Sequence, residues 1–152
     1  MAYTVAEGRQ QLLDTVADAT DELGLALAAL GEAYEQLDEH NANVLEERLF
    51  RPVQLAYGRA SRTHGQFAAR HGLEARMFEA RSAGLPSLGA KGFIESAVEA
   101  VREADGTLAT LQDSLLPVEV GDPQLRGELS DLREIVGHLP QHARELLRTL
   151  GR

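Results

Sequence analysis

Two histidines near the C-terminal end, His138 and His142, are separated by three residues. Side chains four apart share one face of a helix, which is the spacing that lets two imidazoles hold one metal ion. Asp131 and Glu145 lie on roughly the same side, and Pro140 falls between the two histidines. The pattern therefore predicts a metal pair, and its alternative is two partly exposed histidines on a helix flank.

The other histidines narrow the kind of metal protein that this pair predicts. The His-Glu-x-x-His of zinc proteases and the Glu-x-x-His of ferritin-like di-iron bundles are both absent. His64 or His71 offers a third ligand from an earlier helix. One histidine there with a later His-x-x-x-His is loosely similar to DinB-like bundles, which implies a metal-binding bundle protein or a metal-dependent enzyme.

No other catalytic set is visible in the sequence. Cysteine is absent, and so is the Gly-x-Ser-x-Gly of serine hydrolases. The glycine-rich stretch 84–92 lacks the lysine position of a phosphate loop, so a plain connector is the simpler interpretation. The chain is therefore not assigned to any enzyme class, and its cofactor is unknown.

The charge of the chain is acidic and unevenly distributed. The 152 residues carry a net charge of −9, which argues against nucleic acid and anionic lipid as partners. Residues 1–47 contain 11 acidic residues and one arginine, whereas residues 48–81 contain seven arginines and two glutamates. The longest apolar run, 23–31, is too short to span a bilayer, and no secretory signal is visible, so we expect a soluble cytoplasmic protein.

Apolar residues recur at helical spacing in four segments, at about 4–40, 44–71, 90–115 and 123–150. We expect one all-α domain over residues 1–152, an antiparallel up-down-up-down four-helix bundle with a longer irregular connector at 72–90. Asn43 with Glu46 fits a capping box, and Asp122-Pro123 is a strong helix start. Pro52 either kinks the second helix or lies in its first turn.

The centre of the first helix, residues 23–30, is apolar on every side, so we expect cover on two faces. The leading hypothesis is a non-enzymatic interaction or scaffolding protein that forms a homo-oligomer, with a further protein partner possible. A third possibility is a small-molecule pocket near Pro52 and Pro140. The expected partner surface consists of Gly24, Leu25, Ala28, Ala29 and Gly31.

Overall fold

The computed structural model describes residues 3–79 and 88–151, and within these ranges every regular element is a helix. The all-α expectation is therefore confirmed. Among the described residues, no helix combines the length and the apolar character needed to cross a membrane. The elements are α1 (Val5–Glu35), α2 (Glu39–Leu45), the π-helical turn η1 (Glu46–Phe50), α3 (Arg51–Arg70), α4 (Gly89–Asp113), α5 (Leu116–Glu119), α6 (Pro123–Gly137) and α7 (Leu139–Leu150).

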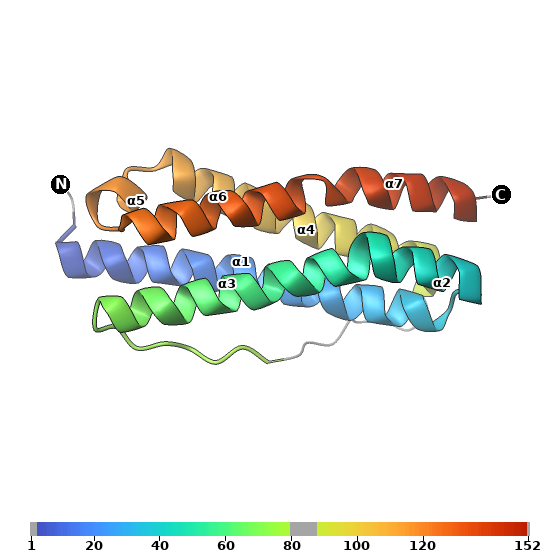
Figure 1. Cartoon of the computed structure of the whole chain (residues 1–152), viewed down its shortest axis with the longest axis horizontal. Coiled ribbons are helices and arrows are strands. Elements are labelled where there is room, and N and C mark those ends of the chain that lie inside the picture. The colour runs from blue at the N-terminus through green and yellow to red at the C-terminus, as the bar shows by residue number, and fades with distance from the viewer. Residues whose placement is uncertain (1–2, 80–87, 152) are drawn as a thin grey trace.

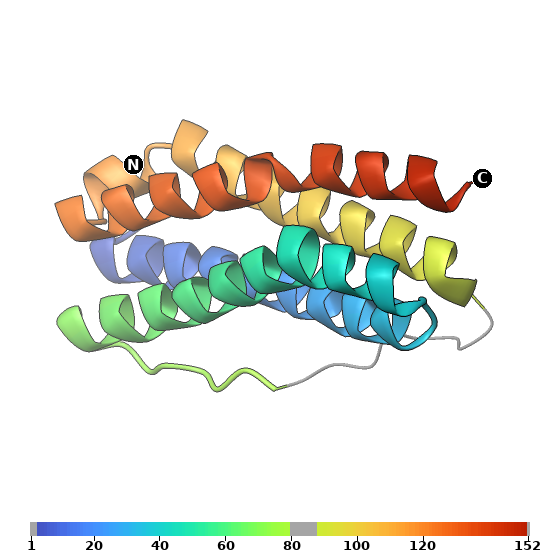
Figure 2. The ribbon, with the colours of Figure 1, turned by 45° about the vertical axis from the view of Figure 1, so that its right-hand side comes forward.

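These elements lie side by side along one long axis (Figure 1). α2, η1 and α3 follow one another without a break, and α6 continues into α7 across His138. The described residues thus form four long helical segments, with α1 packed between α3 and α4, and with α6 and α7 closing the other side (Figure 2).

The helix starts follow from side-chain caps. Thr4 accepts a hydrogen bond from the Glu7 N–H, and Asp122 accepts one from the Leu125 N–H, as the sequence predicted for the Asp122-Pro123 start. The break after α1 comes earlier than expected. The N-cap of α2 is Asp38, which accepts a hydrogen bond from the Asn41 N–H. Asn43 therefore lies inside α2, and the expected capping box is wrong.

Pro52 neither ends nor breaks the second helical segment. It lies in the first turn of α3, and the turn before it is π-helical, with the Arg51 N–H bonded to the Glu46 carbonyl. Proline has no N–H for the carbonyl four residues earlier, which belongs to Arg48. The Nδ1–H of His142 on α7 donates to that carbonyl over 3.3 Å. A neighbouring helix therefore compensates for the bond that Pro52 removes.

The directions of the helices differ from the expected up-down-up-down order. The Tyr3 hydroxyl donates to Glu119 over 2.6 Å, and Arg9 donates to the Val120 carbonyl over 3.1 Å. Because these contacts join the start of α1 to the region just after α4, α4 runs antiparallel to α1. It therefore runs in the same direction as α3, and the order is up-down-down-up (Figure 1).

The long connection between α3 and α4 permits this order. The expectation placed consecutive helices antiparallel, which holds when connectors are short. At about 3.3 Å per extended residue, the 18 residues from His71 to Leu88 are long enough to return the chain along α3. Residues 73–79 of this connection are extended and not helical.

The core consists of the apolar stripes that the sequence predicted, from Leu12 to Leu146. Leu125, Leu129 and Leu132 of α6 are buried, as are Ala97, Val101, Ala104 and Leu108 of α4. Leu115, expected on the same stripe, is 67% exposed because α4 ends at Asp113. The stripe therefore ends where helical geometry ends.

Because Leu108 is buried and Leu115 is exposed, replacing each by alanine should change the free energy of unfolding by different amounts. Leu108 is fully buried, so Leu108→Ala should lower the free energy of unfolding by about 2–5 kcal/mol. Leu115→Ala should change it by less than about 0.5 kcal/mol. Urea unfolding followed by circular dichroism measures both, and equal losses would contradict the packing described.

Candidate functional site

The expected partner surface on α1 divides into covered and uncovered residues. Ala29 belongs to the core, and Gly24 faces α3, where a Cβ would lie 3.1 Å from the ring of Tyr57. Leu25 is 41% exposed, and Gly31 has no atom within 4 Å of the Cβ position. With the half-buried Ala28, these two leave an outward strip in the middle of α1.

A later segment of the chain lies against α1 on the N-terminal side of its apolar centre at 23–30, so the second cover expected over that centre stays a prediction. After α3 the extended residues 73–79, here named the strap, turn back along α1 and α3 (Figure 1). Arg76 of the strap forms an ion pair with Asp21 of α1, and its guanidinium lies 4.5 Å from the ring centre of Phe78. The Phe78 ring meets His64 of α3 edge-on, at 5.0 Å between ring centres.

An open cleft of about 610 Å³ lies between α1, α3 and the strap, and we name it the His64 cleft. His64 is only 3% exposed, and its Nδ1 has no hydrogen-bond partner. From the sequence, His64 is expected only as a possible third metal ligand, and nothing in the sequence predicts this cleft. No local sequence pattern could reveal the cleft, because the strap reaches α1 only after the chain has turned at the end of α3. The cleft is lined by Gln10, Leu13, Asp14, Ala17, Asp18, His64, Glu74, Ala75 and Arg76.

The environment of His64 favours its neutral form. Burial lowers the pKa of the imidazole, and the positive charge of Arg76 on the strap lowers it further. Asp14 and Asp21 on α1 act in the opposite direction and do not outweigh these effects. At neutral pH one ring nitrogen is therefore an acceptor.

The expected metal pair is placed at the junction of α6 and α7. His138 is exposed at this junction, and His142 is half-buried and bonded to the Arg48 carbonyl. Within the described residues, no group of three or more His, Asp or Glu side chains could hold a metal ion. His138 and His142 as metal ligands stay a prediction, while the structure assigns His142 a hydrogen bond beside Pro52.

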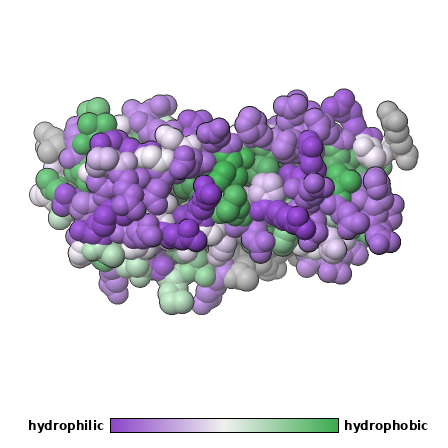
Figure 3. All heavy atoms as spheres, in the orientation of Figure 1, coloured by the Kyte–Doolittle hydropathy of each residue, from purple (hydrophilic) through white to green (hydrophobic). Residues whose placement is uncertain are grey.

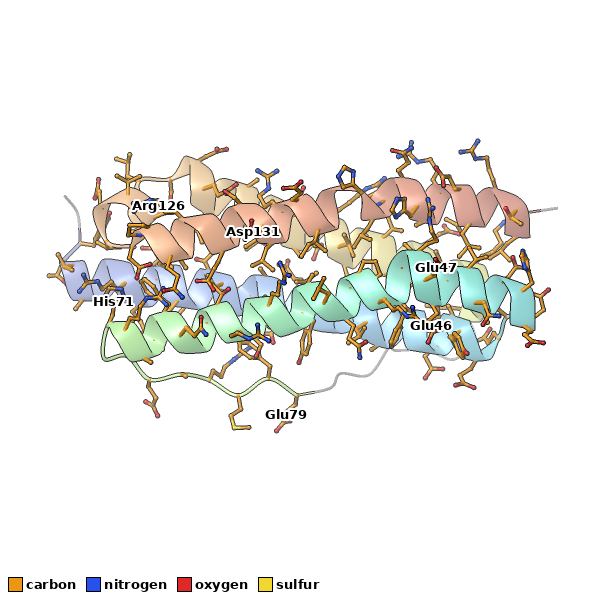
Figure 4. The ribbon with its side chains drawn as sticks, in the orientation of Figure 1. Glu46, Glu47, His71, Glu79, Arg126 and Asp131 are labelled. Atoms are coloured by element: carbon orange, nitrogen blue, oxygen red, sulfur yellow. The ribbon has the colours of Figure 1, made fainter. Side chains whose placement is uncertain are left out.

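His71 and Arg70, at the end of α3, converge on Asp122 at the start of α6; Figure 4 labels His71 in this cluster. His71 Nε2 lies 2.8 Å from the carboxylate, and Arg70 donates to both of its oxygens over 2.9 and 3.0 Å. Partial burial alone would raise the pKa of Asp122, but the bonds from Arg70, the Leu125 N–H and His71 hold it well below its usual range. This cluster therefore joins the end of α3 to the start of α6.

The arginines of the second helical segment form no ion pair with α1 among the described residues. Arg48 pairs with Glu145 of α7, and Arg70 pairs with Asp122. Arg59 and Arg62 lie beside Thr63 at a shallow cleft of about 220 Å³ toward α6. Neither Arg59 nor Arg62 forms an ion pair within the described part of the chain.

Spaces of very different size lie near the two prolines, where a small-molecule pocket is expected. A void in the core, which Val53 and Leu139 help to line, measures about 10 Å³. Such a space holds one water at most. An open cleft of about 550 Å³ does lie at Pro140, between α4 and α7, where Arg102 and Arg144 are among its lining residues.

The comparisons with known proteins find no relative. No family model matches the sequence, and neither a curated protein nor a solved structure is significantly similar. The function is therefore argued from the surfaces and clefts of this chain.

Asp122 should contribute measurably to stability. Asp122→Ala removes the α6 cap and the partner of Arg70, so the free energy of unfolding at pH 7 should fall by about 0.5–2 kcal/mol or more. Because the pKa of Asp122 is lowered in the folded state, its stabilisation is present above the unfolded pKa of about 3.9 and is lost below it. Urea unfolding at pH 7 and pH 3 should show the deficit shrinking. Asp113→Ala, at an exposed site, is the control.

His64 should make the protein less stable in mild acid. Its lowered folded-state pKa means that the unfolded chain binds more protons, so stability is complete above the unfolded pKa of about 6.5 and falls below it. The free energy of unfolding should drop between pH 7 and pH 5, and His64→Leu should reduce that slope. His138→Leu, at an exposed site, is the matched control. Identical slopes for wild type and His64→Leu would refute this account.

Proposed function

We propose that the chain is a non-enzymatic interaction protein, built as a four-helix bundle, that self-associates through two complementary outward surfaces. The observation that supports this proposal is a pair of exposed helix strips with apolar centres and opposite unpaired charges. One strip is on α1 and the other is on α3.

The α1 surface is acidic. Leu25, Ala28, Glu32 and Glu35 follow one another at spacings of three and four, which place them on one side of the helix, and Gly31 adjoins them. Glu32 and Glu35 are exposed and form no ion pair within the described residues. The strip thus has a smooth apolar centre beside two uncompensated carboxylates.

The α3 surface has the same plan with the opposite charge. Arg51, Leu55, Gly58 and Arg62 are spaced by four, three and four residues, and Arg59 lies beside them. Leu55 is 49% exposed, and Gly58 has no atom within 4 Å of the Cβ position. Arg59 and Arg62 are the unpaired arginines described above.

A second copy of the chain is the occupant that fits both surfaces. A two-fold axis that sets the α1 surface of one copy on the α3 surface of the other makes the same contact twice. Pairing two α1 surfaces would instead bring Glu32 and Glu35 of both copies together, and like charges repel. Exposed ion pairs contribute only about 0–1 kcal/mol each. Because salt screens such exposed charges, the association should weaken as the salt concentration is raised.

The remaining surface limits where such a contact can form. Exposed large apolar side chains are spread over the described residues and not gathered in one large area. The face in Figure 3 is mostly hydrophilic, with separate apolar patches near its centre and toward its two ends. A weak contact that depends on charge is more consistent with this surface than an obligate apolar dimer.

Ala28→Arg should disrupt self-association, because it places a long cation at the apolar centre of the α1 surface. Sedimentation velocity should show a shift from oligomer to monomer at equal concentration, with helicity by circular dichroism unchanged. The matched control is Val118→Arg, at a 71% exposed site on α5, which should leave the oligomer intact. A wild-type protein that is monomeric at every concentration would refute the proposal.

Charge exchange tests which surfaces pair. Arg62→Glu should weaken the oligomer, and Glu32→Arg should weaken it as well. The double variant should recover part of the lost association, because the opposite charges meet again with their positions exchanged. Additive losses in the double variant would show that the α1 and α3 surfaces do not face each other.

A further inference from the structure

We propose that the His64 cleft binds the primary ammonium group of an aliphatic amine. This inference goes beyond self-association, because the cleft lies under the strap and shares no residue with the α1 and α3 surfaces. Four features of the cleft lead to this inference. They are the buried imidazole without a hydrogen bond, the unpaired carboxylates, the arrangement of these acceptors on three elements, and the apolar side chains of the wall.

The first observation is the hydrogen bonding of His64. Three polar side chains are buried in the described part of the chain, and the other two have partners: Thr20 donates to the Val16 carbonyl, and Thr63 donates to Glu128. His64 alone among these three has an unpartnered polar atom, Nδ1. Nδ1 itself is covered by protein atoms, so a donor in the cleft would meet the other ring nitrogen, Nε2, which also forms no hydrogen bond within the described residues.

The second observation is the charge around this imidazole. Asp14 and Asp18 line the cleft from α1, and Glu74 lines it from the strap. Asp14 already accepts a hydrogen bond from Gln10, whereas Asp18 and Glu74 form neither a hydrogen bond nor an ion pair within the described residues. Arg76, the cation of the cleft, is paired with Asp21. The free acceptors therefore favour a cationic ligand over an anion.

The third observation concerns the shape of the ligand. The available acceptors come from three different elements: His64 on α3, Asp18 on α1 and Glu74 on the strap. An ammonium group has three N–H donors that point in different directions, whereas a guanidinium is a planar fork that suits one carboxylate. A metal ion is a poorer match, because no metal-binding group of three such side chains occurs in the described chain.

The fourth observation is the apolar part of the cleft wall. Leu13 and Ala17 of α1 and Ala75 of the strap line it beside the polar groups. A short methylene chain attached to the ammonium would lie against these side chains. Two sources share this chemistry, a free aliphatic diamine and a lysine side chain, so the experiment uses a probe of each kind.

Isothermal titration calorimetry at pH 7.5 with 1,4-diaminobutane and with a lysine blocked at both its α-amino and carboxyl groups tests the proposal. At least one probe should bind saturably with one site per chain, and 1,4-butanediol, which has no charge, should not bind. Binding of the diamine alone assigns a free amine, and binding of the blocked lysine assigns a protein side chain. No binding of either probe overturns the proposal.

Substitutions locate the site. Asp18→Asn and Glu74→Gln should each weaken binding by about tenfold, since each removes a charged hydrogen-bond acceptor. Glu79→Gln neutralises a strap carboxylate that does not line the cleft, so it should leave the affinity unchanged. Equal affinities in all three variants would place the binding elsewhere and overturn the proposal.

Nitrogen NMR of the imidazole rings gives a readout that does not depend on stability. The chain has five histidines, and the amine should shift the ring resonances of His64 more than those of the other four. A ligand-induced shift confined to other histidines would contradict the proposal. Self-association of Asp18→Asn and Glu74→Gln should match wild type, which separates failure of this proposal from failure of the proposed function.

Discussion

The apolar contact between α1 and α4 is the interaction on which the other features depend. Leu23, Ala26 and Ala33 of α1 are buried along one line, and the small residues Ala97 and Ala104 of α4 are buried as well. Because small side chains let helices approach closely, this pair can pack along most of its length. The antiparallel direction of α4 requires the chain to return after α3, and that return lays the strap over α1. The His64 cleft exists because of this path.

Proline and charge explain how the second helical segment is held against its neighbours. The carbonyl that Pro52 leaves without a partner is bonded by His142, so α7 packs beside the π-helical turn with a specific hydrogen bond. The arginines of this segment fall into three groups. Arg51 pairs with Glu46 of the same segment. Arg48 and Arg70 pair with α7 and α6, whereas Arg59 and Arg62 remain unpaired and supply the basic side of the proposed oligomer contact.

Much of the helical architecture was predictable because it is local. The spacing of the apolar residues predicted the buried faces of α4 and α6, and Asp122-Pro123 predicted the start of α6. The errors came from competing local signals. Asn43 with Glu46 looked like a cap, but Asp38 starts the helix earlier, and a side chain already inside a helix cannot cap it.

The sequence by itself determined the all-α class, the positions of the apolar stripes and the acidic first segment beside an arginine-rich one. Only the tertiary structure decided the direction of α4, because a connector of 18 residues permits either direction and its length does not choose between them. Likewise, the spacing of His138 and His142 suggested a shared metal, but the partner of His142 depends on a carbonyl 94 residues away. The cleft at His64 joins α1 to α3 and to the strap that follows α3, and no periodicity within one helix predicts such a contact.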